Sequence, residues 1–153
     1  AFVEKLKDLL STHDLPPRFL WLEITESALV PEVEVAASKL RQARALGVHV
    51  ALDDFGTGYS SLALLRDVPA DLVKLDASFV GVATGDPRGE ALLQGIVDLA
   101  HRLGVEVVAE GVENAQEFDL VRRIGCDLVQ GLKFFPALPE DDERWQQLRG
   151  RLQ

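Results

Sequence analysis

The sequence is poor in cysteine and in basic residues. Its 153 residues include a single cysteine, Cys126, which excludes an internal disulfide and a zinc site built on cysteines. Lys and Arg number 16 against 25 Asp and Glu, so the formal net charge is −9. Because binding to a nucleic-acid backbone requires clustered basic residues, we expect no nucleic-acid polymer among the partners. An acidic chain can still bind a phosphorylated ligand if metal ions supply positive charge.

Long apolar runs are also absent. No run approaches the roughly 20 residues that a membrane-spanning helix needs, and no signal peptide is recognisable at the beginning. We therefore expect no membrane segment in this chain and a cytoplasmic location, although a longer parent protein could be tethered to a membrane. The hydrophobic content of 47% and charged content of 27% are typical of a globular protein, and they predict one domain over residues 1–153.

Helix-like and strand-like segments alternate along the chain. Apolar spacing predicts helices over residues 2–10, 31–43, 91–103, 114–124 and 139–152, and a helical turn at 62–65. Short apolar runs predict strands over residues 19–24, 48–52, 72–75, 105–109 and 127–131. Residues 55–61 and 84–89 are predicted loops, and Phe19 and Trp21 are predicted core residues. This alternation predicts an α/β fold with a parallel sheet.

A sequence repeat supports this interpretation. Residues 44–50, 101–107 and 122–128 each contain a helix end, a glycine at the fourth position and the beginning of a strand. Repeated units of this kind are typical of an α/β barrel or of a doubly wound sheet. In both folds, ligands bind at the carboxyl ends of the strands.

Polar residues gather at those predicted strand ends. They comprise seven carboxylates, one amine and one amide: Glu23, Glu26, Asp53, Asp54, Lys74, Asp76, Glu110, Glu113 and Gln130. Carboxylates converge only if positive charge lies among them, and oxygen ligands without histidine or cysteine favour Mg²⁺ or Mn²⁺. Several carboxylates suit a two-metal site that acts on a phosphate ester, with Lys74 beside the phosphate or a metal-bound water. Taken singly, such carboxylates also cap helices, and a lone lysine also forms structural ion pairs.

Five stretches of the sequence stand out: LEITES at 22–27, LDDFGTGYSSL at 52–62, VKLD at 73–76, VAEGVE at 108–113 and QG at 130–131. Together they resemble the EAL domain family, the bacterial cyclic-di-GMP phosphodiesterases. The resemblance implies a TIM-like (β/α) barrel that uses two Mg²⁺ or Mn²⁺ ions. Such a domain cleaves one phosphodiester bond of cyclic-di-GMP to give the linear dinucleotide, in second-messenger signalling.

The resemblance also implies roles for individual residues. Glu23, Asp53, Asp54 and Glu110 correspond to metal ligands, Glu110 alternatively to a general base, and Lys74 to the lysine that holds the attacking water. Gln130, Glu113 and Asp76 correspond to substrate-binding or supporting residues. Glu26 corresponds to the anchor of a regulatory loop that couples dimerisation to metal binding, formed by Phe55, Gly56, Thr57, Gly58, Tyr59, Ser60 and Ser61.

The match covers only part of the family pattern. No Glu-Ala-Leu motif precedes Leu22, the family's Asn ligand is missing, and Leu132 and Phe135 depart from the usual residues. A complete barrel of this type takes about 250 residues, so we expect an incomplete barrel of about five β/α units. Open sheet edges then predict self-association or a homodimer, with weak metal binding and weak or no turnover by this chain alone. We also expect an upstream sensor or GGDEF domain in the parent protein.

Two other functions stay open at this point. A degenerate EAL module would bind cyclic-di-GMP or a protein partner without cleaving anything. Another Mg²⁺-dependent α/β barrel enzyme would act on a phosphorylated or enolisable substrate, and it would bind Mg²⁺ without cleaving cyclic-di-GMP.

Overall fold

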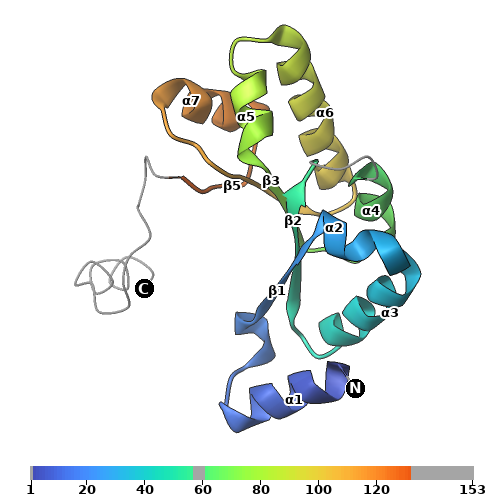
Figure 1. The fold of residues 1–153 in the computed structure, drawn as a ribbon. Coiled ribbons are helices and arrows are strands. Elements are labelled where there is room, and N and C mark those ends of the chain that lie inside the picture. The colour runs from blue at the N-terminus through green and yellow to red at the C-terminus, as the bar shows by residue number, and fades with distance from the viewer. Residues whose placement is uncertain (1, 57–60, 132–153) are drawn as a thin grey trace, which may run out of the picture.

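A five-stranded parallel sheet organises the chain (Figure 1). The structure is a computed structural model, and it describes residues 2–56 and 61–131. The strands are β1 (Trp21–Thr25), β2 (His49–Phe55), β3 (Leu72–Leu75), β4 (Glu106–Ala109) and β5 (Leu128–Val129). Each neighbouring pair runs parallel, as the alternation of helices and strands predicted.

The order of the strands separates the two folds that the sequence left open. The strands lie side by side in chain order, β1-β2-β3-β4-β5. A doubly wound sheet reverses its order at a switch point, whereas a barrel winds in one direction with its helices on one side. The sequential order therefore favours the barrel type of winding.

Among the described helices, α1 precedes β1 and the others lie in the connections between strands. They are α1 (Phe2–Thr12), α2 (Glu26–Leu29), α3 (Val33–Arg44), α4 (Ser61–Asp67), α5 (Ala77–Ala83), α6 (Pro87–Arg102) and α7 (Ala115–Ile124), with short 3₁₀ turns at Pro17–Phe19 and Val30–Glu32. The predicted helix over 139–152 lies outside the described residues. Within those residues, none of the helices combines the length and the apolarity that crossing a bilayer requires.

The main core lies between the sheet and helices α3, α4 and α6, which flank one side of it (Figure 1). Alternate strand residues such as Val50 and Val73 are fully buried there. They belong to the same apolar cluster as Leu40, Leu64 and Leu93 from the three helices. Burying these side chains is the dominant stabilising contribution, and it fixes which face of each strand points away from the helices.

The structure differs from the sequence-based predictions in several places. Helix α5 was not predicted, and α6 begins at Pro87 inside a predicted loop, because the Asp86 side chain caps it by accepting from the N–H groups of Arg88 and Gly89. Phe19 and Trp21 were predicted to be core residues, which is wrong: their exposed fractions are 63% and 41%. Trp21 alternates with Leu22, which packs against the core, and so it lies on the other face of β1.

Candidate metal and catalytic site

Lys74 lies at the centre of a charged cluster formed by four neighbouring strands. Its Nζ atom lies 2.9 Å from Asp53 Oδ1, 2.9 Å from Glu110 Oε1 and 3.3 Å from Glu23 Oε2. Glu23 is on β1, Asp53 on β2 and Lys74 on β3, while Glu110 directly follows β4. Parallel strands end at the same edge of the sheet, and for this reason residues far apart in the sequence meet here.

The surroundings of Lys74 hold it in the charged form. Its side chain is only 12% exposed, and this partial burial opposes the charge. The hydrogen bonds to Asp53 and Glu110 outweigh burial, and the pKa of Lys74 lies above its usual value. The ammonium group therefore stays protonated at neutral pH, where it can donate hydrogen bonds and stabilise negative charge. It cannot serve as a base there.

An irregularity in β2 brings two consecutive carboxylates to one place. The β2–β3 pairing runs from Leu52 opposite Val73 to Phe55 opposite Leu75, so β2 contains one extra residue there. Asp54 lies at this bulge with φ of 53°, in the left-handed region that Asp tolerates better than most residues. Consecutive residues of a regular strand point to opposite faces. The bulge removes that alternation at the Asp53–Asp54 pair.

Carboxylates of the cluster fit a hard divalent cation. Oxygen atoms of Asp53, Asp54 and Glu110 all lie within 4.8 Å of one another. Mg²⁺ and Mn²⁺ prefer oxygen ligands, and a set of three carboxylates without histidine or cysteine matches that preference. These residues could therefore hold the metal, and Glu23, whose side chain is 54% exposed, lies on the other side of Lys74 Nζ as a further carboxylate.

The predicted regulatory loop begins beside a buried carboxylate. Glu26 is 4% exposed, and its Oε2 atom accepts a hydrogen bond from the backbone N–H of Gly56 at 3.3 Å. Phe55 is the buried last residue of β2, and Ser61 is the first residue of α4. Thr57, Gly58, Tyr59 and Ser60 lie outside the described residues. The contact links the beginning of the loop to the end of β1.

The other predicted residues lie at the same edge with contacts of their own. Asp76 caps α5, because its Oδ1 atom accepts from Ser78 N at 2.9 Å; bonding to Ser78 lowers the Asp76 pKa. Glu113 is exposed, and its N–H donates to Glu117 Oε2 at 2.7 Å. Gln130 is exposed, and its N–H donates to Ala109 O at 2.9 Å. The structure thus brings Glu23, Asp53, Asp54, Lys74 and Glu110 together, with Asp76, Glu113 and Gln130 around them.

Sequence reasoning missed the residues behind this cluster. On α5, Ala77 lies against Gly111, the glycine that follows Glu110. Phe79 of the same helix lies against Gly56, the glycine that follows Phe55. The only available signal was a glycine soon after each group of predicted ligands.

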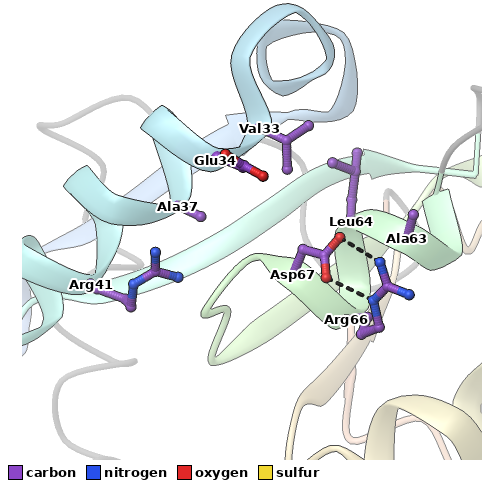
Figure 2. A pocket seen from close by; sticks show the side chains of 8 residues that line it. All are labelled: Val33, Glu34, Ala37, Arg41, Ala63, Leu64, Arg66 and Asp67. Atoms are coloured by element: carbon purple, nitrogen blue, oxygen red, sulfur yellow. Dashed lines mark hydrogen bonds and ion pairs between the residues drawn. The ribbon is translucent and has the colours of Figure 1, made fainter.

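A separate groove lies on the helical side of the molecule. Between α3 and α4 it has a volume of about 940 Å³ and is lined by Val33, Glu34, Ala37, Arg41, Ala63, Leu64, Arg66 and Asp67 (Figure 2). The guanidinium group of Arg66 donates to both carboxylate oxygens of Asp67, at 2.7 and 2.9 Å. The groove contains side chains of both charges and lies away from the strand ends. It is therefore a different site from the cluster at Lys74.

Comparison with known proteins identifies the family. The EAL domain model matches residues 1–137. The Pseudomonas aeruginosa protein named cyclic di-GMP phosphodiesterase PA2567 is 42% identical over 146 residues, which cover 95% of this chain and 25% of that protein. The chain spans between 18% and 25% of the length of the first four curated relatives.

Solved structures agree in fold. The EAL domain of Mycobacterium smegmatis DcpA superimposes with a TM-score of 0.88 at 35% identity, covering 98% of this chain and 66% of that one. The Pseudomonas aeruginosa MucR phosphodiesterase, solved as a c-di-GMP complex, gives a TM-score of 0.83 at 36% identity, covering 95% and 57%. These matches confirm the predicted EAL-type, TIM-barrel-like fold, of which the described residues form five parallel strands. The chain belongs to the EAL domain family.

Proposed function

We propose that this chain contributes the larger part of a metal-dependent site that hydrolyses cyclic-di-GMP to the linear dinucleotide pGpG. The carrying observation is the convergence of Asp53, Glu110 and Glu23 on the amine of Lys74 at the carboxyl ends of four strands. Support comes from the relatives, since several are named cyclic di-GMP phosphodiesterases. Two structural neighbours, MucR and Klebsiella pneumoniae BlrP1, were solved as complexes with c-di-GMP, the latter also with calcium.

The residues of the cluster divide the work by their chemistry. Glu23, Asp53, Asp54 and Glu110 would hold two Mg²⁺ or Mn²⁺ ions through their carboxylate oxygens. Such ions, when bound, neutralise phosphate oxygens and lower the pKa of a bound water. The Lys74 Nζ atom donates hydrogen bonds and can orient the attacking water. In the alternative role of general base, Glu110, whose Oε1 atom lies 2.9 Å from Lys74 Nζ, would accept the proton that this water loses.

The surrounding residues would shape the site for its substrate. We assign Gln130 and Glu113, both exposed at the edge of the sheet, to substrate contact or support, together with Asp76. Glu26 would anchor the loop that begins at Phe55. The cap that Asp76 provides to α5 gives it a structural role as well.

Turnover of cyclic-di-GMP tests this function directly. The 153-residue chain and a longer form extended upstream are incubated with cyclic-di-GMP in Mg²⁺ and in Mn²⁺, and pGpG is quantified by chromatography. We expect Asp53→Asn to abolish turnover. The matched control Asp119→Asn removes an exposed carboxylate on α7, with an exposed fraction of 64%, and should leave turnover unchanged. Turnover that survives Asp53→Asn contradicts the proposal.

The other functions give different results in the same assay. A non-catalytic EAL module binds cyclic-di-GMP, measured by calorimetry, while neither form of the protein cleaves it. Another Mg²⁺-dependent enzyme shows Mg²⁺ binding that depends on Asp53 but no response to cyclic-di-GMP.

We further propose that the chain self-associates and that its parent protein carries an upstream sensor or GGDEF domain. Within the described residues, β1 and β5 are the outermost strands of the sheet. Trp21 on β1 and Leu128 on β5 have exposed fractions of 41% and 51%, and strand edges with exposed apolar side chains recruit partners. The relative MucR is named a bifunctional diguanylate cyclase and phosphodiesterase, which supports a two-domain parent.

A further inference from the structure

Helix α5 contacts the backbone directly behind the candidate metal-binding carboxylates. It begins at Ala77, just after β3, and ends at Ala83. Two glycines that follow the carboxylates, one after β2 and one after β4, lie against its first turn. The helix therefore stands between two chain segments that must be correctly spaced for their carboxylates to share a cation.

The first contact joins Gly56 to Phe79. Gly56 comes two residues after Asp54 and has φ of 97°. A Cβ atom at this position would overlap the Phe79 ring. The backbone after the Asp53–Asp54 bulge therefore rests on the ring, at a distance that only glycine permits.

The second contact joins Gly111 to Ala77. Gly111 follows Glu110 directly and has φ of 65°. A Cβ atom here would overlap the Ala77 methyl group and would lie 3.3 Å from the Ala77 Cα atom. The backbone that carries Glu110 is thus pressed against the first residue of α5.

Helix α5 is itself held in place from three directions. Asp76 caps its beginning through Ser78, and Val80 and Ala83 are 1% exposed. Its far end meets α6, where a Cβ atom at Gly89 would lie 2.9 Å from the Ala83 Cα atom. The buried side of the helix, with Val80 and Ala83, is therefore held by its neighbours, while its other side is exposed.

We propose that α5 is the spacer that sets the distance between the Asp53–Asp54 pair and Glu110, with Ala77 and Phe79 as positioning residues. The inference rests on the proposed metal-dependent function of those carboxylates. Their oxygens lie within 4.8 Å of one another. A backbone shift by the width of a methyl group on either side of α5 would separate ligands that must reach one ion.

The two contacts differ in how readily they can yield. Phe79 borders a hollow of about 220 Å³ that Ser78, Val82, Gly89 and Leu92 also line. Its ring has space to swing away from Gly56. The methyl group of Ala77 is fixed to the helix backbone and has no such freedom. The Gly111–Ala77 contact therefore gives the sharper test.

The test is a double-mutant cycle on the whole 153-residue chain, with Mn²⁺ affinity measured by calorimetry. We expect Gly111→Ala to weaken Mn²⁺ binding about tenfold or more, the range seen when groups supporting metal ligands are removed. Ala77→Gly removes the methyl group that the new side chain would meet. The double variant should therefore bind Mn²⁺ more tightly than Gly111→Ala, although the strain of alanine at positive φ remains. Thermal melts of each variant fix a temperature at which all are folded.

A second pair of variants covers the case in which Gly111→Ala does not fold. Phe79→Leu should weaken Mn²⁺ binding, because the backbone at Gly56 loses its support. The control Val82→Ala, on the same helix with an exposed fraction of 63%, should not. Equal effects of Phe79→Leu and Val82→Ala would overturn the proposal, as would a double variant no better than Gly111→Ala. Wild-type chain whose Mn²⁺ binding is absent, or is unaffected by Asp53→Asn, overturns the proposed function as well. The α5 inference alone is overturned if Gly111→Ala binds Mn²⁺ as tightly as the wild type does, while wild-type binding still depends on Asp53.

Discussion

The carboxylate of Glu26 accepts a hydrogen bond from the backbone N–H of Gly56, 30 residues along the chain, at 3.3 Å. Glu26 is 4% exposed and begins α2, immediately after β1. Gly56 follows the strand that carries Asp53 and Asp54. The geometry of the turn behind two candidate metal ligands thus depends on a buried acid from the neighbouring unit of the fold.

Replacing this acid should loosen the turn. Glu26→Ala leaves a part-buried N–H without this acceptor, which we expect to lower the free energy of unfolding by about 1–3 kcal/mol in urea titrations. Turnover of cyclic-di-GMP should fall together with Mn²⁺ affinity. Glu26→Gln keeps the length of the side chain and an acceptor oxygen. It should therefore lose less stability, less turnover and less Mn²⁺ affinity than Glu26→Ala. Equal losses in the two variants would show that the hydrogen bond to Gly56 is not the reason.

Asp54 combines a ligand role with an unusual backbone, and two substitutions separate these. Asp54→Asn keeps a residue that tolerates φ of 53° but removes the charge. We expect it to lose Mn²⁺ affinity while stability changes little. Asp54→Ala should lose the same affinity and a further ~1 kcal/mol of stability, since most residues disfavour the left-handed region. Calorimetry and urea unfolding measure the two quantities, and equal stabilities of the two variants would contradict the backbone argument.

Lys74 forms ion pairs with three carboxylates, and its removal should make the fold depend on metal. Lys74→Met should abolish turnover and lower the free energy of unfolding without metal by about 2–3 kcal/mol, less than for a fully buried pair because Glu23 is half-exposed. Added Mn²⁺ replaces the missing positive charge. Its effect on the melting temperature should be larger for this variant than for the wild type. Lys7→Met, which breaks an exposed pair with Glu4, is the matched control and should respond to Mn²⁺ as the wild type does.

The strand ends and their polar residues could be predicted because both follow local rules. Apolar runs followed by acids place Asp53 and Glu110 at one edge of any parallel sheet.

The sequence repeat also has a structural counterpart, which its pattern alone did not show. Val50 and Val107 occupy equivalent repeat positions, and each donates its N–H to an aspartate before the next strand, at 2.9 Å to Asp71 Oδ2 and 2.8 Å to Asp127 Oδ2.

The features that were missed depend on contacts between distant segments. Helix α5 contains Gly81 and two β-branched valines, which are weak helix formers, and it is stabilised by the Asp76 cap and by burial of Val80. Trp21 belongs to an apolar run, yet whether it is covered depends on what lies opposite its face of the sheet. It stacks on the His49 ring instead, with centroids 4.6 Å apart. The bulge at Asp54 likewise depends on the register with β3.

Trp21 also gives a test of self-association. Light scattering after size-exclusion chromatography should show the chain as a dimer or larger, because the exposed indole and the edge of β1 favour contact with a second copy. Trp21→Glu should shift the population towards monomer. Val35→Glu places the same charge on α3, at a side chain with an exposed fraction of 47%, and should leave the mass unchanged. A wild-type chain that is monomeric at every concentration would contradict the prediction.

Asp127 should give the fold a distinct sensitivity to acid. Its Oδ2 atom lies 2.8 Å from His101 Nε2 and 2.8 Å from Val107 N. Partial burial opposes ionisation of Asp127, but the bonds to His101 and Val107 outweigh it, so the Asp127 pKa lies below its ordinary value.

A carboxylate whose pKa is lower in the folded protein stabilises the fold above the unfolded pKa, about 3.9, and loses that contribution as pH falls through the folded value. Asp127→Asn should therefore be less stable than the wild type at pH 6, and the difference should shrink as pH falls below about 4. Urea unfolding of both proteins across this range measures it. A difference that stays constant across this range would contradict the prediction, because it would not follow the protonation of Asp127. No difference at pH 6 would show that Asp127 acts as a hydrogen-bond acceptor alone, since asparagine keeps an acceptor oxygen but not the charge.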